Sequence, residues 1–176
     1  MKTNELSGGG VEVGQEDDEL LRRMKTGSSE LAKILRFGAI VDPVKKATYA
    51  LIEIEESIKD GDFSGAVVWR IRGYDLPGLD NMDENWVVSL YDKARKNGDL
   101  FEAFGITQIM FLSWYKKFPD RSESEEGKKV QGLDWENELR GLGEAAKNGT
   151  YKGAEDVAGE YARMVNFNLI KGRQSK

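Results

Sequence analysis

The stretch from residue 42 to residue 66, DPVKKATYALIEIEESIKDGDFSGA, contains one whole helix and the start of the next. Asp42 can cap a helix that Pro43 opens, because proline already has a helical φ and needs no amide partner there. Gly61 supplies the left-handed residue that ends such a helix. Between these residues, apolar side chains recur at spacings of three and four, as one face of a helix requires: Val44, Ala47, Leu51, Ile54 and Ile58. We therefore predict a long amphipathic helix here, although residues 51–55 alternate like a strand.

The junction after this helix has a plan that recurs in the chain: a basic residue, Asp or Asn, Gly, a capping residue and a large apolar residue. The junctions are Lys59–Ala66 (KDGDFSGA), Lys96–Ala103 (KNGDLFEA) and Lys147–Ala154 (KNGTYKGA). A left-handed glycine would end one helix, the Asp or Thr would cap the next, and the apolar residue would hold the two together. Tetratricopeptide-type repeats have similar joints, but the spacing between these glycines is too uneven for a repeat. We interpret them as ordinary helix-to-helix turns.

The remaining chain also has helical patterns, separated by clear breaks. Gly73–Gly78 predicts a loop through Pro77-Gly78, and Arg121–Lys129 predicts an exposed charged loop. Further helices are expected near residues 20–24, 29–35, 62–72, 80–96, 99–118, 133–147 and 153–167. The segment Val67–Ile71 is the main competing strand, because Val-Val-Trp-x-Ile is rich in β-forming residues.

The predicted fold class is therefore all-α: a compact bundle of about six helices. The expected domain organisation is a flexible acidic N-terminal arm at residues 1–18, a helical domain at 19–170 and a short basic tail at 171–176. The segment 99–118 is apolar nearly all round, so its helix should lie at the centre of the core.

The chain contains no cysteine and no histidine. The first absence excludes disulfides, thiolate nucleophiles and cysteine-held zinc or iron–sulfur clusters. The second removes the side chain best suited to proton transfer near neutral pH. We therefore expect a protein that is not an enzyme, with no cofactor and no metal site.

Two groups of carboxylates stand out in the sequence, and side chains of this kind could still hold magnesium or calcium. Asp80, Asp83 and Glu84, with Asp75 nearby, are dense in a loop, but they lack EF-hand spacing and are explained as helix caps. Glu53, Glu55 and Glu56 could be paired carboxylates for acid–base work, but Glu55 and Glu56 lie beside the exposed helix face, and a solvated face is the favoured interpretation. A carboxylate-held magnesium enzyme stays open as the least favoured alternative.

The net charge of -5 does not suggest an indiscriminate polyanion binder. The acidic run lies near the start of the chain, and the segment Tyr161–Lys176 is basic, so the two ends have opposite signs. These ends could be solvated tails, could attract each other between copies, or could bind a small anionic partner. No signal peptide and no apolar stretch long enough for a membrane span is apparent, so a soluble, cytoplasmic protein is expected.

Two segments mix aromatic and basic residues, the first from Trp69 to Tyr74 and the second from Trp114 to Phe118. Such mixtures suit a protein interface, or base stacking with phosphate contacts on a single-stranded nucleic acid. The plain alternative is that the aromatic rings are core and the cations are solvated. The candidate binding residues are Trp69, Arg70, Arg72, Tyr74, Trp114, Tyr115, Lys116, Lys117, Lys171 and Arg173.

The sequence thus favours a non-enzymatic interaction or self-assembly protein that binds a protein partner or further copies of itself. A subunit of a larger assembly, such as a viral coat, matrix or accessory protein, would fit this composition. Nucleic-acid binding through the two aromatic-basic segments is the first alternative.

Overall fold

The computed structural model describes residues 30–118, 129–130, 133–149, 151 and 153–170. The chain divides into two compact units, Met1–Val41 and Asp42–Lys176. In the first unit, helix α2 (Glu30–Ala39) confirms the helix expected at 29–35. The helix expected near residues 20–24, the arm at 1–18 and the tail at 171–176 lie outside the described residues. The division after Val41 was not predicted.

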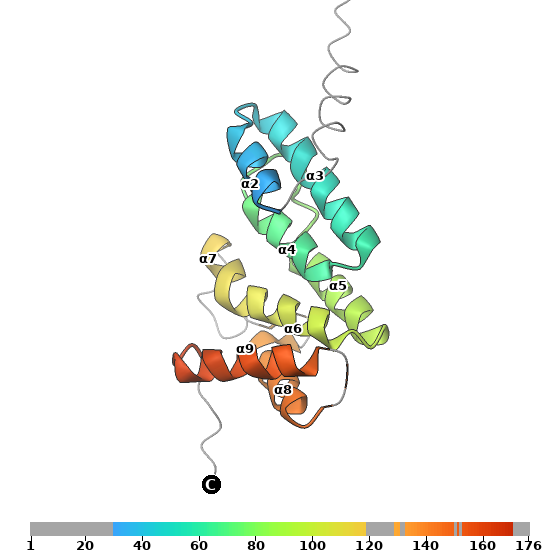
Figure 1. The fold of residues 1–176 in the computed structure, drawn as a ribbon. Helices are drawn as coiled ribbons and strands as arrows, with labels where there is room; N and C mark the ends of the chain where they lie inside the picture. Colours follow the sequence, from blue (N-terminus) through green and yellow to red (C-terminus); the bar gives the residue numbers. More distant parts are fainter. Residues whose placement is uncertain (1–29, 119–128, 131–132, 150, 152, 171–176) are drawn as a thin grey trace, which may run out of the picture. The chain divides into compact units, whose positions relative to one another are not determined.

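The second unit begins with α3 (Pro43–Asp60) and α4 (Phe63–Arg72), which lie side by side (Figure 1). The Asp42 carboxylate accepts hydrogen bonds from the amides of Val44 at 2.8 Å and Lys45 at 3.0 Å. Gly61 ends α3 with a φ of 82°, and Asp62 caps α4. The predicted helices are therefore confirmed, and the strand readings at 51–55 and 67–71 are wrong, because caps at both ends outweigh a short local alternation.

After the loop that follows Gly73, the chain forms α5 (Glu84–Lys96), α6 (Leu100–Ile109), a π-helical turn (Met110–Trp114) and α7 (Tyr115–Lys117). Asp83 caps α5, Gly98 has a φ of 71° and Asp99 caps α6, as the second junction predicts. Helix α6 packs against α4, α5, α8 and α9, so its predicted central position is confirmed. The π-helical turn was not predicted.

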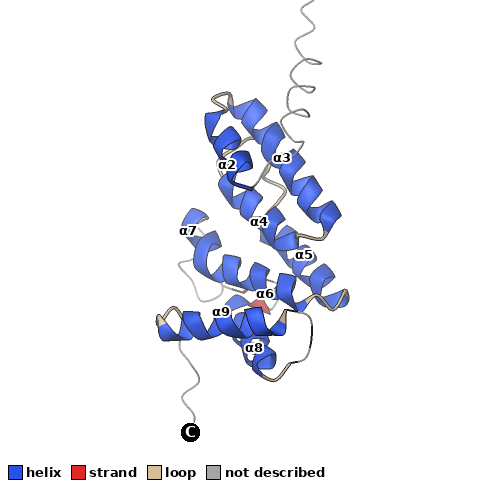
Figure 2. Ribbon diagram, viewed as in Figure 1, coloured by secondary structure: helices blue, strands red, loops and turns tan. Residues whose placement is uncertain are grey.

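The chain then forms a short antiparallel pair, β1 (Lys129–Val130) and β2 (Leu133–Asp134), followed by α8 (Trp135–Lys147) and α9 (Ala154–Asn166). Figure 2 shows how small this sheet is beside the helices, so the all-α fold class is confirmed. Leu133 was expected to start a helix, but it pairs with Val130, and the Asp134 carboxylate caps α8 through the Asn137 amide at 3.2 Å.

The third junction does not follow the predicted plan. Gly149 does not have a positive φ, and Gly153, with a φ of 83°, stands directly before α9. Both positions are glycines, and either can take a positive φ because neither has a Cβ, so the local sequence does not decide which one does. The ring of Tyr151 lies beside Gly149, where a Cβ would meet it at 2.7 Å. The predicted cap, Thr150, lies outside the described residues.

The core of the second unit is built around large aromatic side chains. Trp69, Trp114 and Trp135 are each only 2% exposed. Glu53 is 1% exposed and belongs to the core, whereas Glu55 is exposed as expected and Glu56 is half-buried. Helical spacing alone could not predict that Glu53 is buried and Glu55 exposed, because Glu53 lies beside Ile54 at the edge of the apolar face. None of the described helices combines the length and the low polarity needed to cross a bilayer.

Two glycines of α8 give a matched test of this packing. A Cβ at Gly143 would lie 2.3 Å from ring carbons of the fully buried Tyr161, whereas a Cβ at Gly141 would meet nothing within 4 Å. Gly143→Ala should lower the free energy of unfolding by about 2 kcal/mol, because the packed ring must move. Gly141→Ala should raise it by about 0.5 to 1 kcal/mol, because alanine is the better helix former. Urea denaturation of both variants checks this, and equal midpoints would contradict the packing described.

Candidate functional site

The two aromatic-basic segments predicted from the sequence meet in the second unit. Trp114 stacks on Phe118 with ring centroids 4.3 Å apart and planes at 28°. The Arg70 guanidinium lies 4.8 Å from the centroid of the same Phe118 ring. The Tyr74 and Phe118 rings form a T-shaped pair with centroids 6.5 Å apart and planes at 89°. We call Arg70, Tyr74, Trp114, Lys117 and Phe118 the aromatic–cation cluster.

Arg70 is the buried base of this cluster. Its side chain is 3% exposed, its Nε donates to the Met82 carbonyl at 2.8 Å, and its Nη1 lies 3.4 Å from the Gly73 carbonyl. Burial lowers the pKa of the guanidinium, while the nearby carboxylates of Asp80 and Asp83 act in the opposite direction. Arginine stays charged in proteins, so these carbonyls and carboxylates compensate a buried cation. Arg70 therefore fixes the loop between α4 and α5.

The outer layer of the cluster is exposed. Tyr74 is 43% exposed, and the ammonium of Lys117 lies 4.8 Å from the centroid of its ring. Lys116 is exposed beside it. Neither lysine forms an ion pair with another residue of the described part of the chain. An exposed tyrosine held against the half-buried Phe118, with cations at its rim, can bind an aromatic or an acidic group.

The candidate binding residues predicted from the sequence differ in how deeply they are buried. Trp69, Arg70 and Trp114 are buried, so a partner would have to be contacted by the exposed members. Arg72 is half-buried, with its guanidinium 4.7 Å from the centroid of the Trp69 ring. The Tyr115 side chain, Lys171 and Arg173 lie outside the described residues. Phe118 was not among the candidate residues, although its position four residues after Trp114 on a helix was a signal for their stacking.

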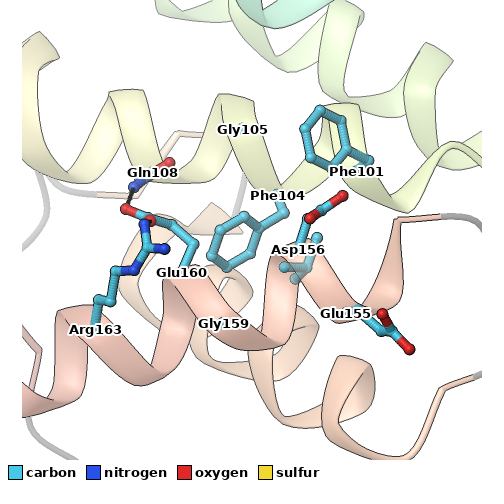
Figure 3. A pocket seen from close by; sticks show the side chains of 10 residues that line it. Phe101, Phe104, Gly105, Gln108, Glu155, Asp156, Gly159, Glu160 and Arg163 are labelled. Atoms are coloured by element: carbon cyan, nitrogen blue, oxygen red, sulfur yellow. Dashed lines mark hydrogen bonds and ion pairs between the residues drawn. The ribbon is translucent and has the colours of Figure 1, made fainter.

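Sequence reasoning missed a second feature, a groove between α6 and α9 (Figure 3). It consists of two hollows of about 360 and 530 Å³ that share Phe101 and Asp156 in their linings. Phe101 is 48% exposed there. No local pattern could reveal this, because Phe101 follows the apolar Leu100 at a helix start, where either residue could have been the inward one.

The two ends of this α6–α9 groove differ in charge. At one end, Glu160 accepts hydrogen bonds from Gln108 at 2.9 Å and from Arg163 at 3.1 Å, so its carboxylate is already partnered (Figure 3). At the other end are the exposed carboxylates of Asp99, Glu155 and Asp156. The acidic end, with the exposed Phe101 ring, is suited to a group that is both cationic and aromatic.

Asp80, Asp83 and Glu84, the dense loop acids that could have held magnesium, have other partners in the structure. Asp83 caps α5, Asp80 acts on Arg70, and Glu84 accepts the indole N–H of Trp135 at 3.0 Å. Within the described ranges, no three acidic side chains gather as a metal site would require. Each of these carboxylates therefore has a structural explanation.

Comparison of the chain with protein-family models, curated proteins and solved structures found no match. The function has to be argued from the residues themselves.

The role of Arg70 as the base of the cluster can be tested by stability. Arg70→Met keeps the length and apolar stem but removes the donors to Met82 and Gly73, so the free energy of unfolding should fall by about 2 to 3 kcal/mol. Arg95→Met, at an exposed position of α5, is the matched control and should change it by less than about 0.5 kcal/mol. Chemical denaturation measures both, and similar losses would show that Arg70 does not organise the loop.

Proposed function

We propose that the protein is a non-enzymatic interaction protein that associates with further copies of itself, and that the aromatic–cation cluster is a contact surface. The observation that carries this proposal is the layered build of the cluster. Tyr74 and Lys117 are exposed, with Lys117 over the Tyr74 ring, and Tyr74 contacts the half-buried Phe118, which lies against the buried Arg70 and Trp114. Exposed side chains that are already ordered by the residues beneath them are well suited to bind a partner.

The energetic reason is preorganisation. Binding costs roughly 0.5 to 1.5 kcal/mol for each side chain that a partner immobilises. Tyr74 already forms a T-shaped pair with Phe118 and has the Lys117 ammonium over its ring, so part of that ordering is present before contact. Tyrosine also buries a large area while its hydroxyl keeps a polar contact, which explains its frequency among the residues that dominate interfaces.

Nucleic-acid binding is the alternative for the same cluster, because a base could stack on Tyr74 while Lys116 and Lys117 contact phosphates. The burial of Arg70 favours the protein partner: its guanidinium is committed to the carbonyls of Gly73 and Met82, so it cannot serve as a phosphate contact. That leaves few exposed cations in the cluster, whereas phosphate contacts supply most of the affinity for single strands.

A self-associating subunit of a cytoplasmic assembly, including a viral coat, matrix or accessory protein, would use such a surface directly. Its useful properties would be shape and charge rather than chemistry, in keeping with a chain that has no histidine and no cysteine. A carboxylate-dependent enzyme gains no support from the acids described above.

The proposal predicts that the full chain self-associates as its concentration rises, and that Tyr74→Ala combined with Lys117→Glu weakens this about tenfold or more. Both changes remove exposed contacts from the interface. A loss of about 1.4 kcal/mol of binding free energy corresponds to a tenfold weaker association. Sedimentation velocity and light scattering over a range of concentrations measure the change. Arg95→Glu is the matched charge reversal, lies outside the cluster and should leave association unchanged.

Two outcomes would count against the proposal. A wild-type chain that stays monomeric at every concentration would remove self-association. Tight binding of single-stranded RNA that falls steeply with salt and is lost in Tyr74→Ala would instead favour the nucleic-acid alternative.

A deletion of residues 1–18 separates the cluster from the acidic N-terminal segment. We expect association to persist without these residues, because the cluster lies wholly in the second unit. Light scattering of the shortened chain measures this. A shortened chain that becomes monomeric, while the full chain associates, would assign the contact to the acidic segment and its attraction to basic residues elsewhere.

A further inference from the structure

We infer that the α6–α9 groove receives the aromatic–cation cluster of a second copy of the chain, so that copies join head to tail. This inference rests on the proposed function and names the partner surface of the same site. The expected occupant of the groove is the cluster of a second copy, because the groove and the cluster are complementary in charge and in side-chain type.

The charges are complementary at the acidic end of the groove. Asp99, Glu155 and Asp156 line it with exposed carboxylates, whereas the cluster presents the ammonium group of Lys117, next to the exposed Lys116. The start of α9 adds a partial positive charge of about half an elementary charge, which opposes a cation there. Three carboxylates outweigh that contribution, so a lysine is still attracted.

The side-chain types also match. Phe101 is 48% exposed at the point where the two hollows meet, and Tyr74 is 43% exposed in the cluster. A T-shaped contact between a tyrosine and Phe101, with a lysine over one of the rings, would be of the same kind as the contacts that Tyr74 already makes with Phe118 and Lys117. Each hollow has the size of sites that enclose a small molecule, which leaves room for one aromatic side chain.

Within one copy the two surfaces cannot meet. Phe101 and Lys117 stand at opposite ends of the helical run formed by α6, the π-helical turn and α7. At about 1.5 Å per residue they are roughly 24 Å apart along that run. The contact therefore has to form between copies, and each copy keeps one unused cluster or groove unless a ring closes.

Symmetric pairing is the competing arrangement, and charge disfavours it. Two clusters facing each other would oppose Lys116 and Lys117 of one copy to the same residues of the other. Two grooves facing each other would place the carboxylates of one copy against those of the other: Asp99, Glu155 and Asp156. Like charges across an interface are costly, so only the cluster-to-groove pairing brings opposite charges together.

The decisive experiment uses two variants, each with one surface blocked. The cluster variant is Tyr74→Ala with Lys117→Glu, and the groove variant is Asp156→Lys. Each alone should self-associate at least about tenfold more weakly than the wild type. Mixed in equal amounts they should form a dimer that does not grow, because the intact groove of one meets the intact cluster of the other. Sedimentation velocity distinguishes this dimer from monomers and from larger assemblies.

A charge exchange within one chain provides an independent check. Lys117→Glu combined with Asp156→Lys restores opposite charges across the head-to-tail contact, so association should recover relative to either single change. Phe101→Ser is a second groove variant that removes the exposed ring without placing a cation at the start of α9. Thermal unfolding of every variant, with Arg95→Glu as the charge control, verifies that the fold is retained.

The outcomes separate this inference from the proposed function. If the cluster variant weakens association but Asp156→Lys and Phe101→Ser do not, the groove is not the partner surface, and only this inference fails. If both single-surface variants weaken association and their mixture stays monomeric, the contact is symmetric, and the inference is again wrong. If the wild type does not associate at all, the proposed function fails as well.

Discussion

The central helical run from Leu100 to Lys117 is the constraint on which the rest of the second unit depends. Helix α6 is apolar on nearly every side, and it can bury all of them only by lying between other helices. It packs against α4, α5, α8 and α9, which places these four elements around one axis. The run also carries both surfaces discussed above, with Phe101 near its start and Lys117 at its end. A single rigid element therefore sets the separation between the groove and the cluster.

The buried polar groups show how this packing is made compatible with function. Arg70 lies inside the fold, but carbonyl oxygens of the following loop accept its hydrogen bonds and two loop carboxylates offset its charge. Glu102, in the first turn of α6, accepts the Ser64 amide at 2.7 Å and so joins α6 to the start of α4; burial raises the pKa of this carboxyl group. Compared with apolar residues of similar volume, such buried ionic groups contribute little net stability. They nevertheless fix the position of the loop to which they are bonded. At the cluster, that fixed position keeps Tyr74 at the surface with its ring ordered.

Local signals predicted most of the helical architecture, because caps act through neighbouring residues. Asp42 with Pro43, Gly61 with Asp62, and Gly98 with Asp99 each determine a boundary through bonds within one turn. The third junction does not follow the plan that its sequence fits, because it contains two glycines, either of which can take a positive φ, and Gly153 rather than Gly149 does so. The small β1–β2 pair was missed for a related reason: two residues per strand are too few for an alternation to be recognised.

The sequence by itself determined most of the helices, the caps of α3 to α6, the central position of α6 and the absence of histidine and cysteine side chains, since each of these depends on residue type and short spacing. It also identified the two aromatic-basic segments. Only the tertiary structure decided that these segments share the Phe118 ring, that Arg70 and Glu53 are buried while Tyr74 is exposed, and that Phe101 faces a groove. Burial and long-range contact depend on how helices distant in the sequence are packed, and periodicity along a single helix does not contain that information.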